Sequence, residues 1–115
     1  MIDLEKTMVR EIKYVNKLGD NATINLESSI KYDSNYNKKE QQSLGKVFLK
    51  VGDEDGKKDF YLSIEFHGVF HVDEDLEADV VSNETYKLLY PHLQAYVSSV
   101  TALSGIPPLR LPSFQ

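Results

Sequence analysis

Four side chains that can bind metal ions recur with the same parity in one segment of the chain: Glu65, His67, His71 and Asp73. Residues of equal parity lie on one face of a β-strand, so these groups would face the same way. His67 and His71 would still be about 13 Å apart on an unbent strand that rises about 3.3 Å per residue. One ion could bind both only if the strand folded at Gly68. We therefore expect solvated histidines on a polar strand face and no metal site, and we keep a metal-dependent enzyme that uses Glu65, His67 and His71 as a remote alternative.

The other reactive residues lack the surroundings that catalysis or ligand binding requires. The acidic runs at 53–55 and 73–77 resemble the start of a calcium loop, but Lys58 and Ala78 stand where that loop needs glycine. No serine lies in a GxSxG turn, no Gly-rich loop precedes a helix, and the chain has no cysteine. We therefore expect neither a catalytic residue nor a cofactor.

Composition excludes several classes of function. The chain has 115 residues, enough for one domain over 1–115, and 41% of them are hydrophobic. Its 13 Lys and Arg face 18 Asp and Glu, giving a net charge of −5, so we expect no nucleic-acid partner. No apolar run is long enough to span a membrane, and Asp3 and Glu5 stand where an export signal needs positive charge. A cytoplasmic location is the expectation.

The elements that would position these side chains follow from hydrophobic periodicity. The first 18 residues fit neither alternation nor a helical stripe well, and we expect a strand over about 8–16. Alternation is clear further on, and the polar run 33–43, which contains Tyr36, is expected to be a loop. Gly68 is the natural place for a bulge in the longest strand. Strands are thus expected at about 8–16, 22–32, 46–51 and 60–72.

One long amphipathic helix should follow the strands. Apolar residues recur at intervals of three and four from Tyr86 to Leu103, after a cap at Ser82 or Asn83. Pro91 predicts either a kink or a second helix that starts there. The order of elements indicates an α+β fold: an antiparallel sheet of about four strands, with a long Pro-kinked C-terminal helix packed on one face. A second helical stripe is formed by mild, mostly small residues that suit a subunit interface or a lightly buried flank: Leu88, Ala95, Ser99 and Ala102.

Three motifs stand in the last two-fifths of the chain: Gly68-Val69-Phe70 at a strand end, Leu89-Tyr90-Pro91 in the helix, and the run Gly105-Ile106-Pro107-Pro108-Leu109-Arg110-Leu111. In their order and spacing they resemble the SecB family of bacterial export chaperones. The resemblance implies a four-stranded antiparallel sheet with a long helix. It also implies a homodimer or a homotetramer with helices between sheets, which would explain the stripe of small residues. The implied activity is that of an ATP-independent holdase for unfolded or partly folded polypeptides.

The chain departs from the family pattern in ways that bear on protein transport. The sequence ends at Gln115, where the family continues into a second helix and a tail that contacts the SecA motor. Gln94 occupies a helical position that is often basic in the family. We therefore expect the resemblance to predict the fold of this chain better than it predicts a role in export or targeting. The alternative function is an oligomeric adaptor, or a toxin–antitoxin-associated chaperone, that binds one specific protein.

The candidate contacts with client polypeptides are apolar residues near the end of the chain, together with one isolated tyrosine. Their alternative role is to cover the edge of the core. The negative net charge would favour basic clients. The candidates are Tyr36, Ile106, Leu109, Leu111 and Phe114.

Overall fold

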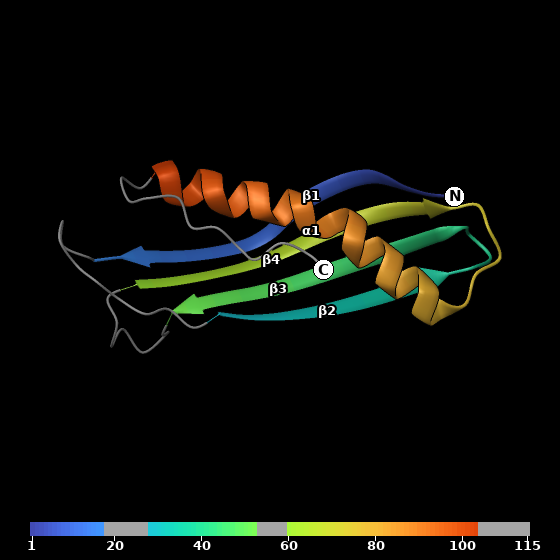
Figure 1. Ribbon diagram of the computed structural model, residues 1–115, viewed down its shortest axis with the longest axis horizontal. Helices are drawn as coiled ribbons and strands as arrows, with labels where there is room; N and C mark the ends of the chain where they lie inside the picture. The colour runs from blue at the N-terminus through green and yellow to red at the C-terminus, as the bar shows by residue number, and fades with distance from the viewer. Residues whose placement is uncertain (18–27, 53–59, 104–115) are drawn as a thin grey trace.

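The computed structural model describes residues 1–17, 28–52 and 60–103. They form one antiparallel sheet, with strand order β1-β4-β3-β2, and one helix that follows it (Figure 1). This is the expected α+β fold. The elements are β1 (Ile2–Asn16), β2 (Ser28–Asn37), β3 (Gln42–Gly52), β4 (Phe60–Val72) and α1 (Ala78–Leu103).

The core lies between α1 and the face of the sheet that the even-numbered residues of β4 form. Phe66 pairs with Val9 on β1 and with Val47 on β3, and these three side chains share that face. From the helix, buried side chains such as Leu89 and Leu93 pack onto it. Burial of apolar surface stabilises this face by about 25 cal/mol per Å². The largest fully buried side chains are Phe60, Phe70, Leu49, Leu62, Ile64, Leu89, Leu93, Val47, Val51, Val72, Val81 and Val97.

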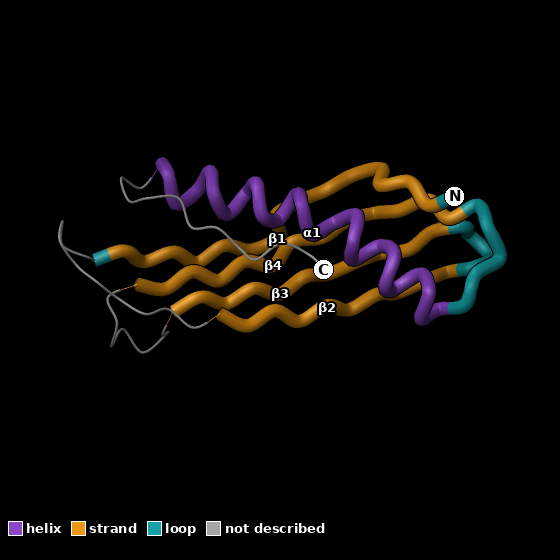
Figure 2. Tube along the Cα trace, viewed as in Figure 1, coloured by secondary structure: helices purple, strands orange, loops and turns teal. Residues whose placement is uncertain are grey.

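The helix crosses the sheet diagonally. Its first half lies over β2, where Tyr32 contacts Tyr86, and its second half lies over β4, where Phe66 contacts Tyr96. Pro91 lies inside the helix, which continues through it, and Figure 2 shows the helix changing direction near its middle. Of the two expected alternatives, the structure therefore has a single kinked helix, and no second helix begins at Pro91. Within the described ranges, no helix has the length and apolar character that crossing a membrane requires.

The helix begins at Ala78, earlier than the expected cap at Ser82 or Asn83. Asp79 lies in the first turn, where a negative charge interacts favourably with the helix dipole. This earlier start brings Val80 and Val81 into the helix. Val81 is fully buried, whereas Val80 is 41% exposed.

Two expectations about the first strands were wrong. Residues 33–37 belong to β2, not to a loop, and β3 begins at Gln42, so the connection is a tight turn at 38–41. In that turn Gln41 has a positive φ of 53° and its amide donates to the Lys38 carbonyl. Residues 22–27 of the expected second strand lie outside the described residues.

The expected bulge at Gly68 is absent, because Gly68 pairs in register with Thr7 on one side and with Gly45 on the other. The irregularities lie in β1 instead, between Leu4 and Lys6 and between Val9 and Glu11. Gly68 is needed for a different reason. A Cβ atom there would lie 2.7 Å from Leu89 Cδ1, so glycine allows the helix to approach the sheet.

Candidate functional site

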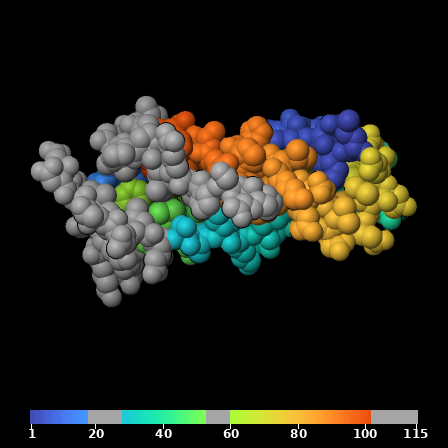
Figure 3. Space-filling model, in the orientation of Figure 1, coloured from blue at the N-terminus to red at the C-terminus, as the bar shows by residue number. Residues whose placement is uncertain are grey.

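A groove with apolar walls runs between the first half of α1 and the start of β1. It has a cavity volume of about 420 Å³, and Figure 3 shows these segments meeting at the end of the molecule that the 73–77 connector closes. Val80 and Leu88 form the helical wall, and each is 41% exposed. The lining residues are Ile2, Glu74, Leu76, Val80, Glu84, Lys87 and Leu88.

Hydrogen bonds and ion pairs at the start of β1 position the connector that closes this groove. The Asp73 amide donates to the Met1 carbonyl at 3.2 Å, and the Met1 amino group contacts the Asp73 carboxylate at 2.5 Å and the Glu74 carboxylate. The bond from this amino group holds the pKa of the Asp73 carboxyl below its ordinary value. Lys38 forms an ion pair with Asp75 from the other side. The connector is thus tied to both β1 and the β2–β3 turn.

The rim of the groove carries charges of both signs. Glu74 contacts the Met1 amino group, and Lys87 Nζ lies 3.6 Å from the Glu84 carboxylate. Apolar walls can take up aliphatic or aromatic side chains. No group in the groove has the arrangement of a nucleophile and a base. The chemistry that these residues offer is noncovalent contact with a ligand that has apolar groups.

Three tyrosines, Tyr32, Tyr86 and Tyr90, cluster where the first half of the helix packs against β2. The hydroxyls of Tyr32 and Thr85 lie 2.7 Å apart, and Thr85 also donates to the Val81 carbonyl. Tyr86 lies between Tyr32 and Tyr90 with its ring tilted to both, and the ring centroids are 4.8 and 5.6 Å away. Burial raises the pKa of all three tyrosines. These tyrosines join the helix to the sheet.

The expected client contacts fall in two places. Tyr36 is partly buried on β2, and its hydroxyl donates to the Glu74 carbonyl at 3.3 Å, which places it beside the connector rather than in a loop. The four other candidates lie outside the described residues, so the structure does not bring them together with Tyr36. They are Ile106, Leu109, Leu111 and Phe114.

The expected interface stripe lies on the outer side of the helix. Leu88, Ala95 and Ser99 are all exposed, and the side chain of Ala102 lies outside the described part of the chain. Leu88 belongs both to this stripe and to the groove. Leu88 could therefore contact either a second subunit or a ligand in the groove. A substitution of Leu88 alone would not distinguish these two roles.

Three of the candidate metal ligands, Glu65, His67 and His71, lie on the face of β4 that points away from the helix, whereas Asp73 lies in the connector after β4. His67 Nε2 is 2.7 Å from the Glu65 carboxylate, and His67 is buried. In the part of the chain that the structure describes, no group of three or more His, Asp or Glu side chains is arranged to hold a metal ion. The contact between Glu65 and His67 is a local hydrogen bond between residues of the same strand face.

Of the residues that line the groove, sequence reasoning identified only Leu88, and the apolar residues that it missed are Ile2, Leu76 and Val80. Val80 lies eight positions before Leu88, so the two side chains are about 80° apart around the helix axis, within the width of one apolar helical face. That signal was hidden because the helix was expected to begin after Val80. Ile2 and Leu76 come from other segments, so their approach to the helix is a property of the tertiary structure.

Comparisons with known proteins establish the fold. The structure matches the SecB-like chaperone Rv1957 of Mycobacterium tuberculosis, solved with a ChAD peptide from the Rv1956 HigA1 antitoxin, with a TM-score of 0.74. The match covers 99% of this chain and 88% of that chain at 14% identity. A protein of unknown function from Streptococcus agalactiae matches with a TM-score of 0.54 at 16% identity, over 98% of both chains. The chain therefore has the SecB-like fold.

One curated sequence is also similar. The uncharacterized protein MJ0357 of Methanocaldococcus jannaschii is 33% identical over 97 residues, which cover 77% of this chain. The chain spans 61% of the length of that relative. No protein-family model matches the chain.

Proposed function

We propose that this protein is an ATP-independent chaperone that holds unfolded or partly folded polypeptides. The observation that supports this most strongly is the SecB-like fold, which it shares over nearly its whole length with a chaperone solved with a bound peptide. The open groove beside the helix supplies the apolar surface that such binding needs.

The affinity would come from the burial of apolar side chains. Val80 and Leu88 are both 41% exposed in the free chain, and a client side chain seated between them would remove more of that surface from water. Each fully buried aliphatic side chain contributes about 1.5–3 kcal/mol, from which the cost of ordering the client is subtracted. Binding by this mechanism needs no nucleotide and tolerates different client sequences.

The proposal is tested with light scattering from a chemically denatured client that aggregates on dilution. The chain should suppress aggregation at stoichiometric excess, and the Val80→Ser/Leu88→Ser variant should need about tenfold more protein for equal suppression. Val15→Ser is the matched control, because Val15 is 43% exposed on β1 but lies outside the groove. No suppression by the unaltered chain, or equal loss in the control, would contradict the proposal.

Leu88 requires a further control because it also belongs to the proposed subunit interface. We propose that the chain forms a homodimer or a homotetramer through the outer side of α1, including Leu88, Ala95, Ser99 and Ala102. Val80→Ser alone changes the groove without changing this stripe. Sedimentation of Val80→Ser and Ala95→Glu separates the two roles: the first should keep the oligomeric state and lose client affinity, and the second should change the oligomeric state.

A second function is favoured by one specific observation. The partner of the M. tuberculosis chaperone in its solved complex is a peptide from an antitoxin, so a single dedicated partner is an alternative to general client binding. Suppression measured on several unrelated denatured proteins distinguishes the two. Similar suppression of all of them supports a general chaperone, whereas failure with all of them favours a dedicated partner. A role in export or targeting remains a further proposal within the general function.

A further inference from the structure

The sheet face opposite the helix carries a half-buried aromatic ring among lysines. Phe48 lies on β3, with Lys46 and Lys50 two residues before and after it on the same face. Lys31 on β2 and Glu65 on β4 are its neighbours across the strands. We call Lys31, Lys46, Phe48 and Lys50 the Phe48 patch. It lies on the side of the sheet away from the helix-side groove.

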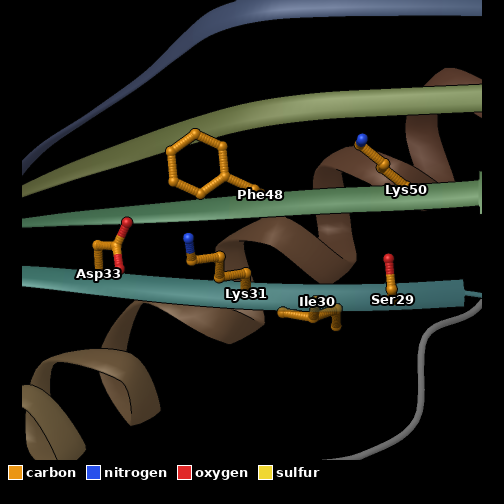
Figure 4. A pocket seen from close by; sticks show the side chains of 6 residues that line it. All are labelled: Ser29, Ile30, Lys31, Asp33, Phe48 and Lys50. Carbon is orange, nitrogen blue, oxygen red and sulfur yellow. The ribbon is translucent and has the colours of Figure 1, made fainter.

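Two hollows adjoin this ring. One has a cavity volume of about 390 Å³ and is lined mainly by residues of β2 together with Phe48 and Lys50. The other has a volume of about 190 Å³ and shares Phe48 and Lys50 with the first. Figure 4 shows Lys31, Phe48 and Lys50 on the same side of the sheet, with the amine of Lys31 directed toward the ring and α1 behind the sheet. The ring therefore borders two recesses on this face of the sheet.

The lysines of the patch are available for an anionic partner. None of the ion pairs between described residues includes Lys31, Lys46 or Lys50. The nearby carboxylate of Glu65 already lies 2.7 Å from His67 Nε2. Lysines concentrated here contrast with the net charge of −5 of the whole chain. This is charge complementarity toward an acidic ligand, on a chain that otherwise repels one.

We propose that the Phe48 patch binds an acidic polypeptide segment with an apolar residue between its carboxylates. Lys46 and Lys50 are about 13 Å apart along β3, at about 3.3 Å per residue. An extended peptide has the same rise, so two acidic residues four positions apart would reach these lysines while the residue midway between them contacts Phe48. Lys31 supplies a third cation from the neighbouring strand.

The surroundings favour a peptide over two other occupants. Asp33 lines the larger hollow and Glu11 and Glu65 line the smaller one, so a continuous phosphate backbone would meet three carboxylates. A second copy could present its own acidic connector at 73–77. That connector is already engaged, because Asp73 and Glu74 contact the Met1 amino group and Asp75 contacts Lys38.

The test uses fluorescence anisotropy with a labelled peptide whose core is Glu-Ser-Phe-Ser-Glu. The peptide should bind, added salt should weaken binding, and the Lys31→Gln/Lys50→Gln variant should weaken it at least about tenfold. Phe48→Ser should also weaken it. Lys38→Gln/Lys39→Gln is the matched control, because it changes the net charge equally at the β2–β3 turn, outside the patch. It should bind the peptide as the unaltered chain does.

Several outcomes would overturn the proposal. These are no binding by the folded chain, equal weakening in the turn control, or equal binding of a peptide with glutamine in place of glutamate. Stronger binding of a single-stranded oligonucleotide would point to nucleic acid instead. A dimer that dissociates in the Lys31→Gln/Lys50→Gln variant, without peptide binding, would make the patch a self-interface.

This inference stands apart from the proposed chaperone function. The urea midpoint of each variant shows whether it folds. Val80→Ser should leave binding of the acidic peptide unchanged, and Lys31→Gln/Lys50→Gln should leave suppression of aggregation unchanged for a client without acidic segments. One site can therefore fail its test while the other passes.

Discussion

The two faces of the sheet are built on different principles, although alternate residues of the same strands form both. On the helix side, β3 and β4 present side chains such as Leu49 and Ile64, which are buried. On the opposite side the same strands present Phe48 and Glu65, which pair across the strands and are only partly buried. The comparison teaches that stability is concentrated on one face. Substitutions on the other face can therefore change recognition without unfolding the chain.

The largest contrast is expected between two phenylalanines. Phe70→Ala removes a ring that is 0% exposed on the helix side and should lower the free energy of unfolding by about 3–5 kcal/mol. Phe48→Ala on the open face should cost less, about 1 kcal/mol, because that residue is only partly buried. Urea unfolding of both variants measures the difference. Equal losses would show that the open face is covered in solution.

The next effect tests how closely the helix approaches the sheet. Gly68→Ala would place a methyl group 2.7 Å from Leu89 Cδ1 and should cost about 1–3 kcal/mol through overpacking. Leu89→Ala should reduce this cost, since it removes the atom that clashes. A double-mutant cycle in urea measures the coupling. If the two losses simply add, the helix does not contact Gly68.

Alkaline pH should weaken the helix side selectively. Burial raises the pKa of Tyr32 in the folded chain, so its contribution to stability is fully present below the unfolded-state value of about 10 and is lost as pH rises through the folded-state pKa. The melting temperature should therefore fall above about pH 10. Tyr32→Phe should fall less steeply, although it starts lower because the contact with Thr85 is lost. Parallel curves for the two proteins would contradict this assignment.

The smallest effect is expected on the open face. Lys31→Gln/Lys50→Gln should change the free energy of unfolding by less than about 0.5 kcal/mol, because both side chains are exposed and neither takes part in an ion pair among the described residues. Thermal melts check this. A loss as large as that of Gly68→Ala would show that the lysines are structural.

The sequence predicted β4 and the body of the helix well, and it failed in β1, where regularity is interrupted. The alternation of β4 placed that strand at 60–72, as observed. In β1 the two register shifts near Glu5 and Arg10 reverse the parity of the apolar residues, so no single period fits. These bulges explain why the hydrophobic residues at the start of the chain fitted neither alternation nor a helical stripe.

Strand β2 was misjudged for a different reason. Its last residues are polar because they lie at the edge of the sheet, so Ser34 and Tyr36 read as loop residues. The candidate groove was beyond prediction, because Ile2 and Leu88 are brought together only by the path of the helix across the sheet. The stripe on the helix could be predicted from the sequence, but the segments that lie beside Leu88 of that stripe could not.

The two open edges of the sheet have unequal consequences for strand exchange. An incoming strand that paired along β1 would have to accommodate two interruptions in the hydrogen-bonding ladder. Strand β2 pairs with β3 without a register shift over its full length. Among the described residues, its outer edge therefore presents no such interruption to an incoming strand. Irregularity in β1 thus protects one margin of the molecule from indiscriminate aggregation, and it leaves the opposite margin to depend on its polar side chains.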